Sequence, residues 1–155
     1  EEVYSSEHHV FSFTPTSLRA KEIVGGYEFA FSNNFSIKLT GIYQYNVSDN
    51  ISSDSFVSYG GKAEMRLYPL NQAPNGLYFA PNIGISKHNS TSDVSMNLIY
   101  FAGSGGFQLI HQKGVTVDIF AGMGAYYLKS DNPIDLPNPV FDYAPVMGVS
   151  TGYAF

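Results

Sequence analysis

Apolar and polar residues alternate along most of the chain, and the alternation is clearest in residues 57–86. Before the segment Pro69–Gly76, the odd-numbered positions are apolar or glycine, whereas the even-numbered positions include Lys62, Glu64 and Arg66. After this segment, the odd-numbered positions are apolar again. A period of two is the repeat of a β-strand, and Pro, Gly and Asn between two such runs mark a hairpin. The stretch therefore predicts two antiparallel strands with one apolar face and one polar face.

The same alternation predicts six further strands and no amphipathic helix. The eight expected strands are His8–Thr14, Glu22–Ser32, Phe35–Asn46, Val57–Leu67, Leu77–Ser86, Met96–Ile110, Val115–Leu128 and Ala144–Phe155. Eight consecutive strands without a helix predict an all-β fold. We expect residues 1–155 to form a single domain, an eight-stranded antiparallel up-and-down β-barrel.

The connections between the expected strands alternate in length. Ser32–Asn34 and His111–Gly114 are tight turns, whereas Val47–Ser55, Lys87–Val94 and Lys129–Tyr143 are longer and polar. Short turns at one rim and longer loops at the other are typical of outer-membrane barrels, whose long loops lie outside the cell. The pattern of connections therefore indicates a transmembrane barrel.

The distribution of charge favours the same interpretation. The apolar face carries no charged residue in any expected strand, and charge on a lipid face costs about 2–4 kcal/mol at mid-bilayer. The opposite face combines charged residues with many glycines. The interior of an eight-stranded barrel is just wide enough for side chains, so glycines suit the inside and aromatic residues the outside. A soluble barrel with an apolar core is the alternative.

The inward face is expected to hold paired charges that fill the lumen, because buried charges are stable only when they are paired. The predicted members of this network are Glu22, Glu28, Lys38, Lys62, Glu64, Arg66 and Asp118. A proton or ion path is the functional alternative. We favour the structural interpretation because so small a barrel leaves little free bore.

Composition narrows the choice of partners. The formal net charge of −5 provides no basic surface for nucleic acid, and the absence of cysteine excludes disulfides and thiol chemistry. No apolar run approaches the ~18 residues that a membrane helix needs. We interpret the chain as the mature form left after removal of a signal peptide, located in the bacterial outer membrane.

The end of the chain, Val149–Phe155, alternates apolar residues and closes on an aromatic ring. It resembles the signal that the barrel-assembly machinery recognises, with Tyr153 and Phe155 as its aromatic residues. With the eight-strand pattern, the chain resembles the family of small outer-membrane barrels that includes the membrane domain of OmpA. Glu64–Pro69 and Gly76–Pro81 are also similar to an uncharacterised family of small barrels in Bacteroidota, which implies no activity. The chain departs from these families in lacking Trp and in its short outer loops.

Some eight-stranded barrels modify lipid A, so catalytic patterns deserve a check. His88-Asn89-Ser90 has the spacing of a His and a Ser two positions apart, but it falls in an expected loop. His8 and His9 would point to opposite faces of a strand and cannot share a metal. Gly103–Gly106 lacks the Lys and the helix of a phosphate loop. We therefore expect no catalytic residue, no metal site and no cofactor.

The expected loops contain two further candidate features. Their acidic residues are Asp49, Asp54, Asp93, Asp131, Asp135 and Asp142, beside Lys87 and Lys129. These carboxylates suit divalent cations that bridge to lipopolysaccharide, although a solvated acidic rim is the simpler interpretation. The segment Asn132–Asp142 is the candidate partner loop, because apolar residues in a loop often mark an interaction surface. Its apolar residues are Ile134, Leu136, Val140 and Phe141.

The sequence therefore favours a non-enzymatic outer-membrane barrel with a structural or protein-interaction role. The expected partners are outer-membrane lipid and lipopolysaccharide, the barrel-assembly machinery and another envelope protein. Two alternatives stay open: a conduit or binder for small hydrophobic ligands, and an enzyme that modifies lipid A.

Overall fold

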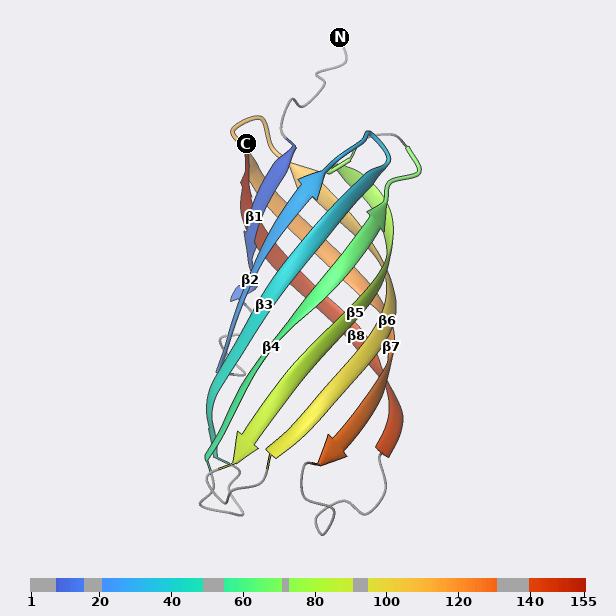
Figure 1. Cartoon of the computed structure of the whole chain (residues 1–155). Coiled ribbons are helices and arrows are strands. Elements are labelled where there is room, and N and C mark those ends of the chain that lie inside the picture. The colour runs from blue at the N-terminus through green and yellow to red at the C-terminus, as the bar shows by residue number, and fades with distance from the viewer. Residues whose placement is uncertain (1–7, 16–20, 49–54, 71–72, 91–94, 131–139) are drawn as a thin grey trace.

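The chain forms one closed barrel of eight antiparallel strands, each paired with its sequence neighbour and the last paired with the first (Figure 1). The structure is a computed structural model, and it describes residues 8–15, 21–48, 55–70, 73–90, 95–130 and 140–155. The predicted all-β barrel is confirmed. None of the described residues belongs to a helix long and apolar enough to cross a membrane.

The strands differ greatly in length. Their bounds are β1 His9–Phe13, β2 Glu22–Ala30, β3 Phe35–Ser48, β4 Ser55–Leu67, β5 Gly76–Ser90, β6 Ser95–Ile110, β7 Val115–Ser130 and β8 Val140–Ala154. The strands from β3 to β8 have 13 to 16 residues, whereas β2 has 9 and β1 has only 5. The wall is therefore shorter along β1 and β2 than elsewhere.

Three of the expected loops are wrong in their bounds, because strands continue into them. The ladder between β5 and β6 extends to the pair Asn89↔Ser95, and β8 begins at Val140 rather than at Ala144. Alternating hydrophobicity stops where side chains become polar on both faces. Backbone hydrogen bonding needs no such alternation, so the ladders run past the apolar segments.

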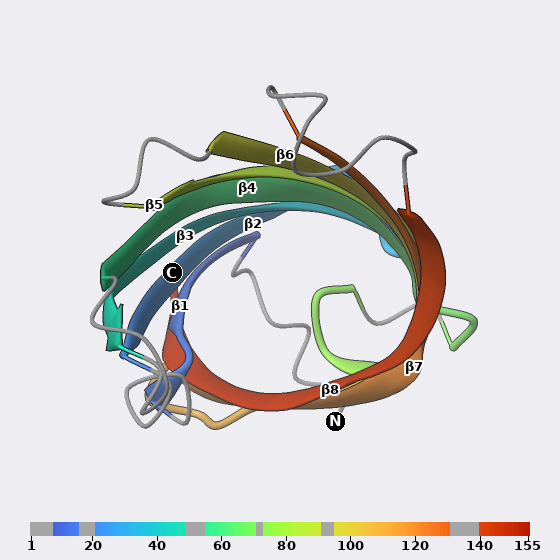
Figure 2. The same cartoon turned by 90° about the horizontal axis from the view of Figure 1, so that it is seen from below.

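The barrel has a turn-side end and a loop-side end. The turn-side end carries the connections 31–34, 68–75 and 111–114, and the loop-side end carries the others. Both described chain ends lie at the turn-side end, at the top of Figure 1, where His9 and Phe155 exchange backbone hydrogen bonds. Seen along its axis, the wall encloses a single lumen (Figure 2).

Burial is inverted relative to a water-soluble protein. Among described residues, the fully buried set comprises six hydrophobic and thirteen polar or charged residues, so the interior is mainly polar. Large hydrophobic side chains instead line the outside, for example Leu39 at 55% and Phe101 at 57% exposure. The alternation read from the sequence therefore places charge inside and apolar groups outside.

Candidate functional site: the lumen

The guanidinium group of Arg66, from β4, occupies the centre of the turn-side lumen and is 1% exposed. Its Nε donates to Glu64 Oε1 at 2.5 Å, and its Nη1 donates to Glu28 Oε2 at 3.1 Å. Nη1 also donates to Gln108 Oε1 at 2.9 Å, and Nη2 donates to Asp118 Oδ2 at 2.8 Å. The planar fork of arginine thereby links side chains from β2, β4, β6 and β7.

Two buried tyrosines hold the carboxylates in place. The hydroxyl of Tyr68 donates to Glu28 Oε1 at 2.8 Å, and that of Tyr78 donates to Asp118 Oδ1 at 2.7 Å. The ring of Tyr78 also lies 4.1 Å from Cζ of Arg66, within the range of a cation–π contact. The carboxylates are thus hydrogen-bonded by neutral donors as well as by bases.

Two lysines complete the ion pairs. Lys38 Nζ lies 3.1 Å from Asp118 Oδ2, and Lys62 Nζ lies 3.1 Å from Glu64 Oε2. Lys62 also lies over the ring of Phe120, 5.2 Å from its centroid. We call the six joined residues the lumen cluster: Glu28, Lys38, Lys62, Glu64, Arg66 and Asp118. Its three bases balance its three acids when all are ionised.

The lumen cluster contains six of the seven charged residues predicted to form a network. The seventh, Glu22, lies at the loop-side start of β2, opposite Gln44, and the ion pairs of the lumen cluster do not include it. Tyr68 and Tyr78 were missed as members of the network. Both have even numbers, as the inward-facing Arg66 does, so alternation could have identified them. However, Tyr68 directly precedes a proline, which indicates the start of a turn.

Glycines make room for aromatic rings inside the lumen, although aromatic residues were expected mainly on the outside of the barrel. Three glycines each stand directly across from an inward ring, and an added Cβ would overlap that ring. The pairs are Gly84 with Tyr100, Gly106 with Tyr78, and Gly148 with Phe120. The inward glycines are therefore sites of close packing between neighbouring strands.

The charged groups of the lumen cluster are all engaged in ion pairs. Five of its six charged residues are buried and Lys62 is partly buried, and the adjacent hydroxyls of Tyr68 and Tyr78 donate to its carboxylates. Such a network rigidifies a polar interior when every member is satisfied. The described residues also include no group of three or more His, Cys, Asp or Glu that could hold a metal ion.

The Ser–His spacing predicted at His88 differs in the structure. His88 lies in β5 rather than in a loop, and its Nε2 is 3.1 Å from Ser86 Oγ. A serine nucleophile also needs a third group to orient the histidine. Within the described part of the chain, no hydrogen bond joins His88 to an acid, so the pair alone does not make a catalytic site.

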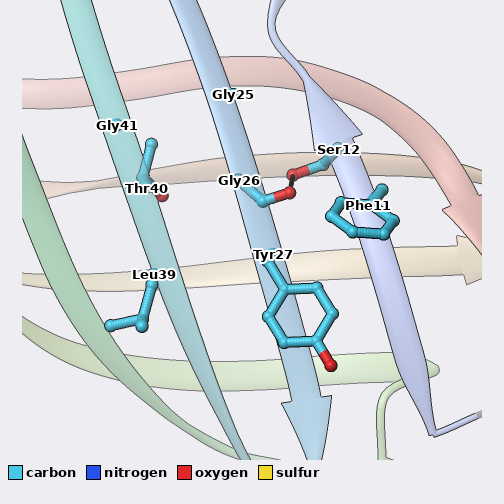
Figure 3. A pocket seen from close by; sticks show the side chains of 8 residues that line it. All are labelled: Phe11, Ser12, Gly25, Gly26, Tyr27, Leu39, Thr40 and Gly41. Carbon is cyan, nitrogen blue, oxygen red and sulfur yellow. Dashed lines mark hydrogen bonds between the residues drawn. The ribbon is translucent and has the colours of Figure 1, made fainter.

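The outer wall carries a hollow of about 510 Å³ over β1, β2 and β3 (Figure 3). Its outward lining includes the side chains of Phe11, Tyr27 and Leu39. Its floor includes Gly25 and Gly41, where an added Cβ would meet nothing within 4 Å. No charged residue lines it. Its chemistry suits a hydrocarbon chain and not a polar ligand.

Aromatic rings gather where the chain ends meet. The ring of His9 stacks on Phe155 with centroids 5.5 Å apart, and its Nδ1 lies 2.6 Å from the hydroxyl of Tyr27. Phe155 also stacks on Phe11 at 5.7 Å. Tyr153, the other aromatic residue of the predicted assembly signal, is 56% exposed on the outer face. The closing strands are therefore held together by ring contacts as well as by backbone bonds.

The predicted loop features are only partly described. Ile134 and Leu136 of the candidate partner loop lie outside the described residues, as do Asp49, Asp54, Asp93, Asp131 and Asp135. Val140, Phe141 and Asp142 belong to β8, and Lys87 and Lys129 belong to β5 and β7, so their assignment to loops is wrong. They lie in strands because the β5–β6, β6–β7 and β7–β8 ladders extend far enough to include them.

Comparisons of the chain with protein-family models, with curated proteins and with solved structures found no match.

Proposed function

We propose that this protein is a non-enzymatic barrel of the bacterial outer membrane with a structural or protein-interaction role. The observation that carries the proposal is the inverted burial: the ion-paired charges face the lumen, and large apolar side chains cover the outside. An exposed apolar surface of this extent suits hydrocarbon and not water.

The outer face supports this proposal because its apolar belt ends in polar residues. Lys87, Asn97 and Lys129 form one row across β5, β6 and β7 at the loop-side end. The next outward row toward the turns is Ile85, Ile99 and Tyr127. Long basic side chains and tyrosines at the edge of an apolar belt are typical of a membrane interface.

The proposal predicts that the folded protein requires detergent or lipid, because plain buffer would expose the whole apolar belt. The unboiled protein should migrate on a denaturing gel differently from the boiled protein, since the closed barrel resists unfolding. The measurement is gel mobility, with circular dichroism of the detergent-refolded sample. A folded, monodisperse monomer in plain buffer would contradict the membrane assignment.

A second candidate function, binding of a small hydrophobic ligand, is favoured by the loop-side lumen. Several of its inward residues are apolar and only half-buried, in contrast to the lumen cluster. They include Val24, Ile42, Leu98 and Leu128. A lipophilic fluorescent probe should then bind the detergent-solubilised barrel and lose affinity in Leu98→Glu. Equal binding by the unaltered protein and by Leu98→Glu would show that the probe binds the micelle or the outer wall and not the lumen.

A further inference from the structure

Among the described residues, no strand lies beside the loop-side half of β8 on the side away from β7. β8 pairs with β7 along its whole length, from Leu128↔Val140 to Val115↔Tyr153. Its pairing with β1 covers only the residues from Thr151 to Ala154, because β1 ends at Phe13. The stretch from Val140 to Ser150 is thus an open strand edge among the described residues.

The direction of the backbone groups along this edge follows from two hydrogen bonds. The N–H of Ala154 donates to Gly114 O, toward β7, whereas the N–H of Phe155 donates to His9 O, toward β1. N–H and C=O groups of successive residues alternate in direction along a strand. The N–H and C=O groups of the odd-numbered residues of β8 therefore point away from β7. We call Phe141, Tyr143, Pro145, Met147 and Val149 the free edge.

Two properties of the free edge agree with a missing neighbour. Met147 is 72% exposed, more than any other large hydrophobic residue described, because no adjacent strand shields it. Pro145 has no N–H, and proline within a sheet is found on edge strands. At this position, the proline removes no hydrogen bond from the β7 ladder.

We propose that the free edge binds an extended strand of a different protein, which would continue the sheet beyond β8. This inference rests on the proposed membrane function, because each unpaired backbone group in hydrocarbon costs several kcal/mol. Neither lipid chains nor a rigid side chain supplies donors and acceptors at every second residue. Another β-strand supplies them with the correct spacing, which is how strand addition gives affinity.

The chemistry of the partner segment follows from the surroundings of the free edge. It would run antiparallel to β8, from the turn-side end to the loop-side end, as β1 does. Its outward residues would be apolar, beside Tyr143 and Met147, and its inward residues small, beside Ala144 and Gly148.

A second copy of this chain does not meet these requirements. Two copies inserted in the same direction have β8 strands that both run toward the turn-side end. Strands of such barrels tilt by about 35–45°, so two β8 edges related by a two-fold axis along the membrane normal would cross instead of pairing antiparallel. A second copy of this chain is therefore excluded as the partner.

Amide exchange measured by NMR on the detergent-solubilised barrel tests the proposal. The N–H of Tyr143 donates to Asp142 Oδ1 at 2.7 Å, so it is left out of the comparison. In the free protein, the amides of Phe141, Met147 and Val149 should exchange at least tenfold faster than those of their even-numbered neighbours, which bond to β7. A synthetic peptide with the sequence of residues 117–128 serves as the strand probe. It copies the strand that already pairs antiparallel with β8, and it should slow these three odd-numbered amides at least tenfold. The same peptide with every amide N-methylated should have no effect.

Two proline variants provide a matched control. Met147→Pro removes an N–H only from the free edge, so the barrel should keep its denaturation midpoint but lose most of the peptide effect. Val146→Pro removes an N–H from the β7 ladder and should lower the midpoint. Protected odd-numbered amides in the free protein, or no slowing by the peptide, would overturn the proposal. Folding in plain buffer would instead overturn the membrane function, because the exchange pattern is measured independently of it.

Discussion

At the scale of single residues, parity along a strand predicts which way a side chain points but not what it contacts. The inward position of Arg66 follows from the alternation in residues 57–67. Its bonds to Glu28 and Asp118 span 38 and 52 positions in sequence, so they depend on strand register and barrel closure. Alternation alone does not fix either of these. Membership of the lumen was therefore predictable, and the pairing was not.

Replacing Arg66 with alanine should destabilise the barrel by roughly 3–5 kcal/mol, because it leaves three buried carboxylates with only two bases. The measurement is the free energy of unfolding in urea, in detergent micelles. Lys62→Ala is the matched control. Lys62 has a single ion pair, to Glu64, so its replacement should lower the free energy of unfolding by less. An unchanged midpoint for Arg66→Ala would show that the guanidinium does not organise the lumen.

Gly106→Val should destabilise the barrel by about 1–3 kcal/mol, the usual cost of overpacking. The new side chain would displace the ring of Tyr78 and its hydrogen bond to Asp118. Gly41→Val is the control, because its side chain would enter the empty outer hollow. Thermal melting of both variants in detergent compares the two sites. Equal losses would mean that strand glycines act through the backbone and not through ring packing.

At the scale of strands and turns, the connection between β6 and β7 sets the register of two ladders at once. Gly114 has φ of +80°, and its N–H donates to His111 O at 2.7 Å. Its own carbonyl accepts from the N–H of Ala154 in β8. The turn therefore joins β7 both to the preceding strand and to the following one.

Gly114→Ala should destabilise the barrel by about 1–3 kcal/mol, because a residue with a side chain is strained at this positive φ. Its Cβ would also come within 2.6 Å of Ala154 O. Gly103→Ala is a suitable control, since nothing lies within 4 Å of its added Cβ. Denaturant midpoints of the two variants should differ clearly. Similar midpoints would show that the turn does not need glycine at position 114.

The number and order of the strands were predictable from alternation and turn residues, but their lengths were not. The end of β5 at Ser90 depends on a ladder that continues among polar residues, and the start of β8 at Val140 depends on its pairing with Leu128. The early end of β1 fits Pro15, which restricts the residue before it and has no N–H to donate. Its consequence, the free edge of β8, depends on strands more than a hundred residues apart and has no local signal.

At the scale of the whole molecule, the barrel combines an apolar outside with a lumen closed on its turn side. The closure comes from paired side chains that are fixed to five different strands, β2, β3, β4, β6 and β7. An eight-stranded wall leaves no space beside such a cluster for a hydrated ion.

The protein should therefore show no stepwise ionic conductance in a planar lipid bilayer. Insertion would be verified separately by the gel mobility of the recovered protein. An absence of conductance would then not be caused by a failure to insert. Arg66→Ala offers a comparison, since it removes the central group of the lumen cluster. Reproducible conductance steps from the unaltered protein would support the ion-path alternative instead.

The meeting of His9 and Phe155 also makes the barrel a candidate for circular permutation. With these ends joined by a short linker and new ends opened at 111–114, every strand would keep both neighbours, so the permutant should refold in detergent. Its last strand would then be β6, which ends in Leu109 and Ile110. If Tyr153 and Phe155 act as an assembly signal, such a permutant would fold in the test tube but fail to assemble in cells. The permutant would thereby distinguish the order of the strands along the sequence from their order around the barrel.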